Sequence, residues 1–374
     1  MVIFYNRCTR DNVSSMLEKM ARVLVVGAGM TGAATAASIR QHIPEIGSIT
    51  IWDKGRGAGG RMSTARCPQD SSITADLGAQ YITLTKEYSD KRQSIYSELI
   101  QHNILSHMTG KIEGPNNFDE PGAQHFVTPK GVSSLVKYFI NKSGAEVKYQ
   151  RTVADVSFDS DKKIKVETKE AITENFDVVI LTLPVPQILQ LNGSVHDLID
   201  READLKCGLQ SVSYSSRYAL AMFFPPNTTL PVSWSAQYLA DDPCIRYMAV
   251  DQVKRGLETN SAGQSLVVHT HVPFGLSHLE EDMESVKATV MSRVREILPG
   301  LPEPLSAKIQ RWRYSQIHKA YKDSPGCVVL NKKPLVILAG DGFSHSTFDG
   351  CLDSAEAVVR SLKENLQSSP TSGL

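Results

Sequence analysis

The sequence has no excess of charge and no long apolar run. Its 374 residues carry 40 Lys and Arg against 40 Asp and Glu, so the chain offers no electrostatic footprint for nucleic acid or for an anionic membrane. The longest apolar stretches, residues 178–183 and 335–339, fall far short of the roughly 20 residues that span a bilayer. We therefore expect a soluble protein that binds neither nucleic acid nor membrane.

The sequence also lacks paired cysteines and a secretory signal. Its six cysteines lie far apart, without a C-x-x-C pair and without histidines at metal-ligand spacing, so no metal site and no disulfide framework are predicted. Residues 1–19 have no apolar core of signal length and are interpreted as a disordered N-terminal extension, with Met20 as an alternative start. Reduced thiols and the missing signal favour a cytoplasmic protein.

The strongest pattern that is present joins an apolar strand, a glycine turn and a helix of small residues, over residues 22–39. Gly27 permits a sharp bend, Gly29 lets the backbone approach a pyrophosphate, and Gly32 lets the helix pack closely on the sheet. The N–H groups at the helix N-terminus would hold the phosphates, where the helix dipole also favours negative charge. The pattern predicts a dinucleotide-binding βαβ unit.

A second strand, over residues 48–52, ends at Asp53, whose carboxylate can accept both hydroxyls of an adenosine ribose. The run that follows, KGRGAGGRMST, resembles the second fingerprint of the glutathione-reductase-type FAD flavoproteins. In this run Gly60 permits close passage of the chain, and the Arg61 guanidinium can pair with a phosphate in a bidentate fork. The segment DLGAQY at 76–81 resembles the strand that reaches the flavin in that family. A plain surface loop is the alternative for the glycine-rich run.

The C-terminal part contains a third element of the same kind. Residues 335–342, LVILAGDG, form a predicted buried strand that ends in an acid between glycines, and a helix follows from Phe348. This unit resembles the C-terminal FAD motif, in which Asp341 accepts from a ribityl hydroxyl and the positive helix end faces the flavin. An ordinary turn acid is the alternative for Asp341. The candidate FAD-binding residues are Gly27, Gly29, Met30, Thr31, Gly32, Asp53, Lys54, Gly60, Arg61, Met62, Gln80, Tyr81, Val153, Asp341, Gly342 and Gly350.

Hydrophobic periodicity predicts the remaining elements. The expected helices cover residues 87–103, 131–142, 187–200 and 283–298. A small β-meander is expected from 146 to 183, and strands at 218–224 and 265–272 suggest an antiparallel sheet covered on one side. The predicted FAD-binding domain comprises 20–85, 126–185 and 306–366, and the interleaved α+β substrate domain comprises 86–125 and 186–305, before a tail at 367–374.

From residue 21 to about 365 the sequence resembles the renalase family, within the amine-oxidase-like group of FAD flavoproteins. The segments that carry the resemblance are VLVVGAGMTG, WDK with GGRMST, TADLGAQYIT, SVSYSSRYAL, PCIRY, WRYSQ and GDGFSHSTFDGC. The N-terminal extension departs from that family. The resemblance implies an α/β fold, with a Rossmann-type FAD-binding domain like those of glutathione reductase and p-hydroxybenzoate hydroxylase, and non-covalently bound FAD.

The resemblance further implies oxidation of the 2- and 6-dihydro isomers of NAD(P)H to β-NAD(P)+, with O2 reduced to hydrogen peroxide. The partners would be a small-molecule dinucleotide and O2. Two alternatives stay open. One is an FAD-dependent amine oxidase acting on catecholamines, although the chain lacks the covalent-flavin cysteine motif of the monoamine enzymes. The other is a secreted signalling protein with a secondary flavin site, which the absent signal segment disfavours.

The substrate pocket is predicted from chemistry alone, because a nicotinamide needs a flat apolar face and one or two hydrogen-bond donors. Tyr81 is expected at the flavin-facing end of its strand. The other candidates are aromatic or cationic residues in the expected substrate domain and beside it, namely Tyr214, Arg217, Tyr218, Trp234, Arg246, His269 and Trp312. For each of them, a core aromatic or a surface cation is the alternative.

Overall fold

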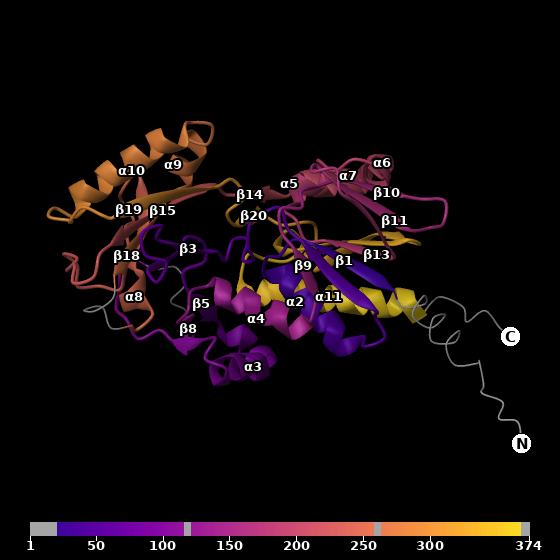
Figure 1. Cartoon of the computed structure of the whole chain (residues 1–374), viewed down its shortest axis with the longest axis horizontal. Coiled ribbons are helices and arrows are strands. Elements are labelled where there is room, and N and C mark those ends of the chain that lie inside the picture. Colours follow the sequence, from indigo (N-terminus) through magenta and orange to yellow (C-terminus); the bar gives the residue numbers. More distant parts are fainter. Residues whose placement is uncertain (1–20, 116–120, 258–262, 368–374) are drawn as a thin grey trace, which may run out of the picture.

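The computed structural model describes residues 21–115, 121–257 and 263–367. The chain forms two lobes, each built on a six-stranded sheet (Figure 1). The predicted N-terminal extension lies outside the described residues, and so does the tail from residue 368. No helix in the three described stretches is long and apolar enough to cross a membrane. The cysteines in these stretches, Cys67, Cys207, Cys244, Cys327 and Cys351, carry free thiols.

The first lobe contains the predicted strand, glycine turn and helix at the centre of a parallel sheet. Only the edge strand β21 runs antiparallel to its neighbour. The strands in spatial order are β21 (Cys327–Lys332), β22 (Leu335–Ala339), β13 (Val178–Leu181), β1 (Arg22–Val26), β2 (Ser48–Trp52) and β9 (Glu146–Lys148). The central strands are apolar over nearly their whole length because both faces of the sheet are covered.

Helices cover one face of this sheet, and a small β-meander with short helices covers the other (Figure 1). The helical layer consists of α2 (Met30–His42), α3 (Lys86–Gln101), α4 (Ser133–Ser143) and α11 (Phe348–Gln367). The other layer consists of β10 (Val153–Phe158), β11 (Ile164–Thr168), β12 (Thr173–Phe176), α5 (Val185–Ile188), α6 (Ser194–Arg201) and α7 (Ala203–Gln210). Side chains alternate along β1, so Val23 and Val25 face the helices while Leu24 and Val26 face the meander.

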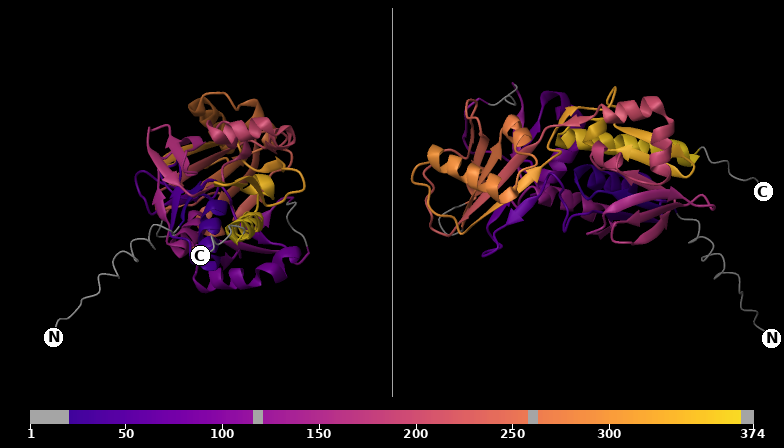
Figure 2. Two further views of the ribbon diagram at one scale, coloured as in Figure 1. Left: turned by 90° about the vertical axis from the view of Figure 1, so that its right-hand side faces the viewer. Right: turned by 90° about the horizontal axis from the view of Figure 1, so that it is seen from above.

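The second lobe is an antiparallel sheet joined at one edge by a short parallel strand. Its strands in spatial order are β19 (Ser306–Trp312), β15 (Arg217–Phe224), β18 (Gln264–Thr270), β17 (Ile245–Val250), β16 (Ala236–Tyr238) and β7 (Ile112–Glu113). The helices of this lobe are α8 (Asp251–Lys254), α9 (Val272–Ser277) and α10 (Met283–Ile297). Seen from above, α10 lies at the opposite end of the molecule from α11 (Figure 2).

Short elements join the lobes. The antiparallel pair β3 (Thr64–Arg66) and β4 (Thr74–Asp76) packs on the second sheet, and β14 (Ser213–Tyr214) pairs with β20 (Ile317–Lys319) between the lobes. A three-stranded sheet contains β5 (Ile82–Leu84), β8 (Gln124–Val127) and β6 (Ser106–His107). A single 3-10 turn, η2 (Asp341–Phe343), links β22 to α11.

The predicted division of the chain differs from the structure in three places. Helix α3, assigned by sequence to the substrate domain, packs in the first lobe through Tyr96 and Leu99. Residues 185–212 also stay with the first lobe, because Val195, Ile199 and Leu209 face the meander side of its sheet. Strand β19, assigned to the FAD-binding domain, is instead an edge of the second sheet. The chain crosses between lobes near β14, about thirty residues after the predicted proline boundary.

Two further expectations about the sheets need correction. Residues 146–148 form β9, which pairs with β2 in the main sheet, so the meander begins only at Val153. The second sheet is covered on both faces: α10 packs on one side through Val286 and Val290, and the β3–β4 pair covers the other. Between the helices predicted over 87–103 and 131–142, where the sequence predicted no strand, the structure also has the short strands β7 and β8.

Candidate active site

Two glycines of the turn between β1 and α2 have different surroundings. Gly32 permits close packing, since a Cβ there would lie 1.9 Å from the carbonyl oxygen of Gly27. At Gly29 the φ angle is −86°, and a Cβ would meet no atom within 4 Å. Gly29 also precedes α2 without any side chain capping the helix. The packing within the chain does not require glycine at position 29, and the open space beside an uncapped helix N-terminus fits a phosphate group.

Asp53 lies beside this turn, at the end of β2. Its Oδ2 accepts from the N–H of Ala28 at 2.7 Å and its Oδ1 accepts from the N–H of Gly55 at 2.6 Å. Each oxygen keeps acceptor capacity for a ribose hydroxyl. The side chain of Lys54 is exposed, whereas that of Val153 is buried in the core, so only the backbone of Val153 can contribute to a binding site.

The glycine-rich loop folds back on the phosphate turn. Gly59 forms a β-bridge with Gly29, and its N–H donates to the carbonyl oxygen of Ala28 at 2.9 Å. Gly60 lies next to Gly29, whose Cα would be 3.4 Å from a Cβ at position 60. Met62 is buried in the core of the first lobe, as are Met30 and Thr31 along α2. The structure therefore brings the two glycine motifs together.

Arg61 and Asp341 bind each other. The Arg61 guanidinium donates to both oxygens of Asp341, at 2.5 and 2.7 Å, and also to the carbonyl oxygen of Ser315. Burial opposes the charge of Arg61, but the adjoining Asp341 outweighs it and raises the pKa of Arg61. The sequence predicted separate roles on a phosphate and on a ribityl hydroxyl. In the structure the two side chains form one bidentate pair. The guanidinium still has further N–H donors, and the carboxylate oxygens can still accept further hydrogen bonds.

Three other predicted residues surround this pair. The ring centroid of Tyr214 lies 5.7 Å from Cζ of Arg61, and a Cβ added to Gly342 would lie 2.9 Å from the Tyr214 hydroxyl. Gly350 is in the first turn of α11 and packs against His345. Tyr214 therefore lies beside the Arg61–Asp341 pair, on β14, and not on the second sheet. Cys351, beside Gly350, is close to Thr31 and Asp341, and burial raises its pKa to about 11.

The second sheet presents a row of side chains across one face. Cross-strand partners Ala219, His269, Tyr247 and Tyr238 lie side by side on β15, β18, β17 and β16. The Tyr238 hydroxyl is 2.7 Å from that of Tyr81, the residue immediately before β5. We call this set of Tyr81, Tyr238, Tyr247 and His269 the aromatic wall.

Two predicted pocket residues are on the opposite face of the second sheet. Tyr218 is fully buried under α9 and α10, and its hydroxyl donates to the carbonyl oxygen of His278 at 2.7 Å. Trp234 is buried in the same core. Strand alternation explains the position of Tyr218, because residue 218 must point away from the face that carries Arg217 and Ala219. Trp312, opposite Arg217 on β19, donates its indole N–H to the carbonyl oxygen of Leu77.

The aromatic wall is held uncharged. Burial, followed by the nearby charges of Arg217 and Lys254, lowers the pKa of His269 to about 3. Burial and the neighbouring Tyr81 raise the pKa of Tyr238, and burial raises the pKa of Tyr247 well above its ordinary value. At neutral pH the wall therefore presents a neutral imidazole and protonated phenols.

A buried ion cluster that the sequence did not predict lies beside this wall and is connected to it through Gln80. Lys254 lies 2.6 Å from Asp251, and Arg255 contacts Asp251 at 2.9 Å and Asp76 at 2.7 Å, with all four side chains at most 2% exposed. Lys254 also donates to Gln80 Oε1 at 2.9 Å, and the other amide atom of Gln80 lies 3.2 Å from Nε2 of His269. The cluster thus fixes Gln80, a predicted cofactor residue, against the wall. The sequence of α8, DQVK, is polar, so its burial could not be predicted from hydrophobic periodicity.

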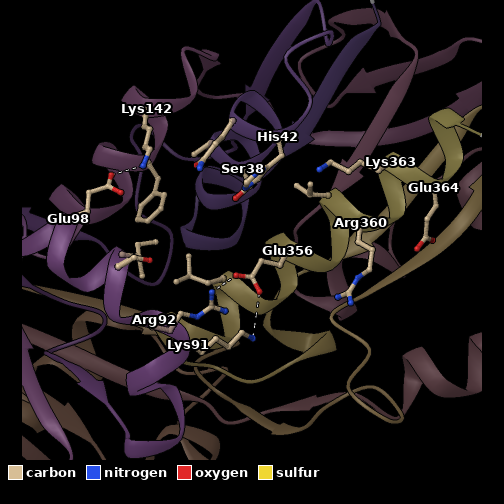
Figure 3. A pocket seen from close by; sticks show the side chains of 17 residues that line it. Ser38, His42, Lys91, Arg92, Glu98, Lys142, Glu356, Arg360, Lys363 and Glu364 are labelled. Atoms are coloured by element: carbon tan, nitrogen blue, oxygen red, sulfur yellow. Dashed lines mark hydrogen bonds and ion pairs between the residues drawn. The ribbon is translucent and has the colours of Figure 1, made fainter.

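A separate hollow of about 780 Å³ lies on the outer side of the helical layer, among α2, α3, α4 and α11 (Figure 3). Much of its lining is charged, and ion pairs such as Lys142 with Glu98 and Arg92 with Glu356 cross parts of it. None of the predicted site residues lines this hollow. It is distinct from the site formed by the glycine motifs and the aromatic wall.

The fold and the glycine motifs define an oxidoreductase that holds a dinucleotide cofactor on a Rossmann-type sheet. Residues 25–99 match the NAD(P)-binding Rossmann-like domain, and residues 92–362 match the flavin containing amine oxidoreductase family. Renalase of Mus musculus is 44% identical over 344 residues, which are 92% of this chain and 99% of that protein. The chain belongs to the renalase family of flavin-containing amine oxidoreductases, and its cofactor is FAD.

Solved structures share the fold at low sequence identity. A provisionally named protoporphyrinogen oxidase from Exiguobacterium sp. 255-15 is 15% identical, with a TM-score of 0.68 over 93% of this chain and 99% of that chain. A putrescine oxidase redesigned in its cofactor binding is 12% identical, with a TM-score of 0.64 over 92% and 99%. These likenesses confirm the α/β fold that the sequence predicted, with a Rossmann-type domain.

Proposed function

We propose that the protein oxidises the 2- and 6-dihydro isomers of NAD(P)H to β-NAD(P)+ and that O2 becomes hydrogen peroxide. The donor loses a hydride, which carries two electrons and one proton. O2 takes up these two electrons together with two protons, one from the hydride and one from solvent. FAD, when bound, supplies the two-electron acceptor and returns the electrons to O2. The residues of this chain have to bind the donor, orient it and keep its ring flat against the site.

The observation that carries the proposal is the neutral aromatic wall. A dihydropyridine becomes aromatic when it loses hydride, so its oxidation requires no protein base at the donor carbon. The wall matches this requirement, because the pKa of His269 is lowered to about 3 and its Nε2 lies against the Gln80 amide. The tyrosines offer aromatic ring faces, with the rings of Tyr238 and Tyr247 tilted by 57° to each other. The Tyr81 and Tyr238 hydroxyls, 2.7 Å apart, hold those two rings in place.

An amine donor is the second candidate, because the family is named for amine oxidation. An alkylammonium ion would approach a wall that carries Arg217 on the same face. Like charges at close range disfavour binding. An anionic dinucleotide is attracted by the same guanidinium, which favours the dinucleotide over the amine.

Anaerobic stopped-flow measurement of flavin reduction tests the proposal. Three donors are compared on the holoenzyme: 2-dihydro-NAD, ordinary 4-dihydro-NADH and a catecholamine. We expect rapid bleaching of the flavin absorbance by 2-dihydro-NAD. The 4-dihydro form should react far more slowly, because it carries its hydride at a different ring position and presents the wrong carbon. Rapid bleaching by the catecholamine, together with slow bleaching by 2-dihydro-NAD, would overturn the proposal in favour of the amine.

A further inference from the structure

Two arginines adjoin the aromatic wall at the edge of the second sheet where the strands β15 and β17 begin. Arg217 precedes Ala219 by two residues on β15, so both side chains are on the same face. Arg246 is on β17, where the pairing passes from Ile245 with Thr270 directly to Tyr247 with His269. Arg246 is therefore the extra residue of a β-bulge, a feature that redirects a side chain.

The bulge turns Arg246 toward the wall. Its guanidinium carbon lies 5.2 Å from the centroid of the Tyr238 ring, and Tyr238 pairs with Tyr247 in the row of the wall. Among the described residues, its N–H groups donate to the carbonyl oxygens of Leu239, at 3.2 Å, and Pro115, at 3.4 Å. Arg217 likewise donates to a carbonyl oxygen, that of Thr270, at 3.3 Å.

In the part of the chain that the structure describes, neither guanidinium group pairs with a carboxylate. Burial and the charge of Arg246 lower the pKa of Arg217. Asp242 acts on His271 near this edge, and Arg293 already binds Asp242 at 2.6 Å. His271, also nearby, places its Nε2 at 3.0 Å from the Leu239 carbonyl oxygen, and burial lowers its pKa, so it adds no charge at neutral pH.

Two like charges held close together are unfavourable unless an anion joins them. A guanidinium offers planar donors that match the oxygens of a phosphate. The phosphates of FAD are expected elsewhere, at the glycine turn of the first lobe, so this edge of the second sheet has a different ligand. Because the two arginines lie next to the aromatic wall, their ligand is the phosphate of a molecule whose ring binds on the wall.

We propose that Arg217 and Arg246 form the phosphate-binding site for the nucleotide substrate. The inference rests on the proposed function, and it adds that the enzyme recognises its donor by phosphate as well as by ring. A dihydronicotinamide that carries a phosphate then binds through both the wall and the arginine pair. A dihydronicotinamide riboside, which has no phosphate, binds through the wall alone.

The test compares the 2-dihydro forms of nicotinamide riboside, nicotinamide mononucleotide and NAD. The apparent dissociation constant of each comes from the saturation of anaerobic flavin reduction, in wild type and in Arg246→Gln, Arg217→Gln and the control Arg66→Gln. Arg66 is exposed, and within the described stretches its side chain donates to the carbonyl oxygen of Ser71. We expect Arg246→Gln to weaken the mononucleotide and NAD about tenfold, the scale of a lost charge-assisted hydrogen bond. The riboside and the limiting reduction rate should stay unchanged.

Two further measurements do not depend on turnover. Calorimetric titration with β-NAD+ should show the same loss of affinity in Arg246→Gln, and raising the ionic strength should weaken the binding of β-NAD+ to wild type. If Arg217→Gln does not fold, Arg246→Gln at the partly exposed bulge still decides the question. Equal affinities for all three donors, unchanged by either substitution, would refute the arginine site while leaving the dihydropyridine activity intact. Failure of every dihydronicotinamide to bleach the flavin would instead refute the proposed function.

Discussion

Gly29 and Gly32 are separated by one turn of α2 but have different physical requirements. The Cβ of an alanine at position 32 would overlap the carbonyl oxygen of Gly27, whereas at position 29 it would point into open space. We expect Gly29→Val to leave the thermal stability of the apoprotein nearly unchanged and to abolish FAD binding, because the side chain takes the space of a phosphate. Gly32→Ala should lower the stability of the apoprotein itself.

The measurement is the flavin absorbance of each purified variant together with its melting temperature after removal of flavin. Acid precipitation of the holoenzyme should also release the flavin into the supernatant, as non-covalent attachment requires. A Gly29→Val protein that purifies yellow with full occupancy would show that the phosphates lie elsewhere.

Asp53 has a structural role as well as its predicted contact with the ribose. Asp53→Ala should weaken FAD binding by roughly 1 to 3 kcal/mol, the scale of losing hydrogen bonds to a charged group. The limiting rate of flavin reduction in the remaining holoenzyme should change little, because the ribose is remote from the reacting ring. Fluorescence titration of apoprotein with FAD gives the affinity.

The matched control for Asp53 is Asp159→Ala in the meander, which also removes two backbone hydrogen bonds to a carboxylate. This control should bind FAD normally. A normal affinity in Asp53→Ala combined with slow reduction would contradict the placement of Asp53 at the adenosine ribose.

Individual residues were predictable where their spacing in the sequence sets their surroundings. The glycines, Asp53 and the strand before Asp341 follow one another locally, and the structure brings their motifs into one site. Tyr218 and Trp234 show the limit. Aromatic character identifies both core and pocket residues. Strand alternation decides the face that Tyr218 occupies, and Trp234 lies outside the strands, where no such rule applies.

At the scale of elements, sequence periodicity identified most helices and strands but not their neighbours. The helix predicted over 87–103 is present as α3, yet it packs in the first lobe and not in the second. The amphipathic pattern specifies that one helix face is buried, while the partner depends on contacts distant in sequence. The same reasoning applies to β9 and β19, whose pairing partners lie far away along the chain.

The buried ion cluster joins two of these elements, β4 and α8. Asp251→Asn would leave Lys254 and Arg255 buried beside too little negative charge. We expect a loss of about 3 to 5 kcal/mol in the free energy of unfolding, the scale for breaking one partner of a buried ion pair. Chemical denaturation followed by tryptophan fluorescence measures this loss.

The control for the cluster is Lys91→Met, which removes an exposed partner of Asp353. Exposed pairs contribute at most about 1 kcal/mol, so this variant should unfold close to wild type. Equal stability of Asp251→Asn and Lys91→Met would show that the cluster does not hold β4 against α8.

The two lobes together determine how the whole molecule responds to pH, because one lobe carries the FAD motifs and the other the aromatic wall. With the pKa of His269 lowered to about 3 and that of Tyr238 raised, neither group changes charge between pH 6 and 9. Hydride loss from a dihydropyridine also needs no proton transfer at its carbon. We therefore expect the anaerobic reduction rate with 2-dihydro-NAD to be nearly constant over this range. A catecholamine must first lose its ammonium proton, so its rate would rise with pH through the pKa of the substrate. Stopped-flow reduction across the range separates these profiles, and a rate with 2-dihydro-NAD that follows a single ionisation near neutrality would contradict a wall held uncharged.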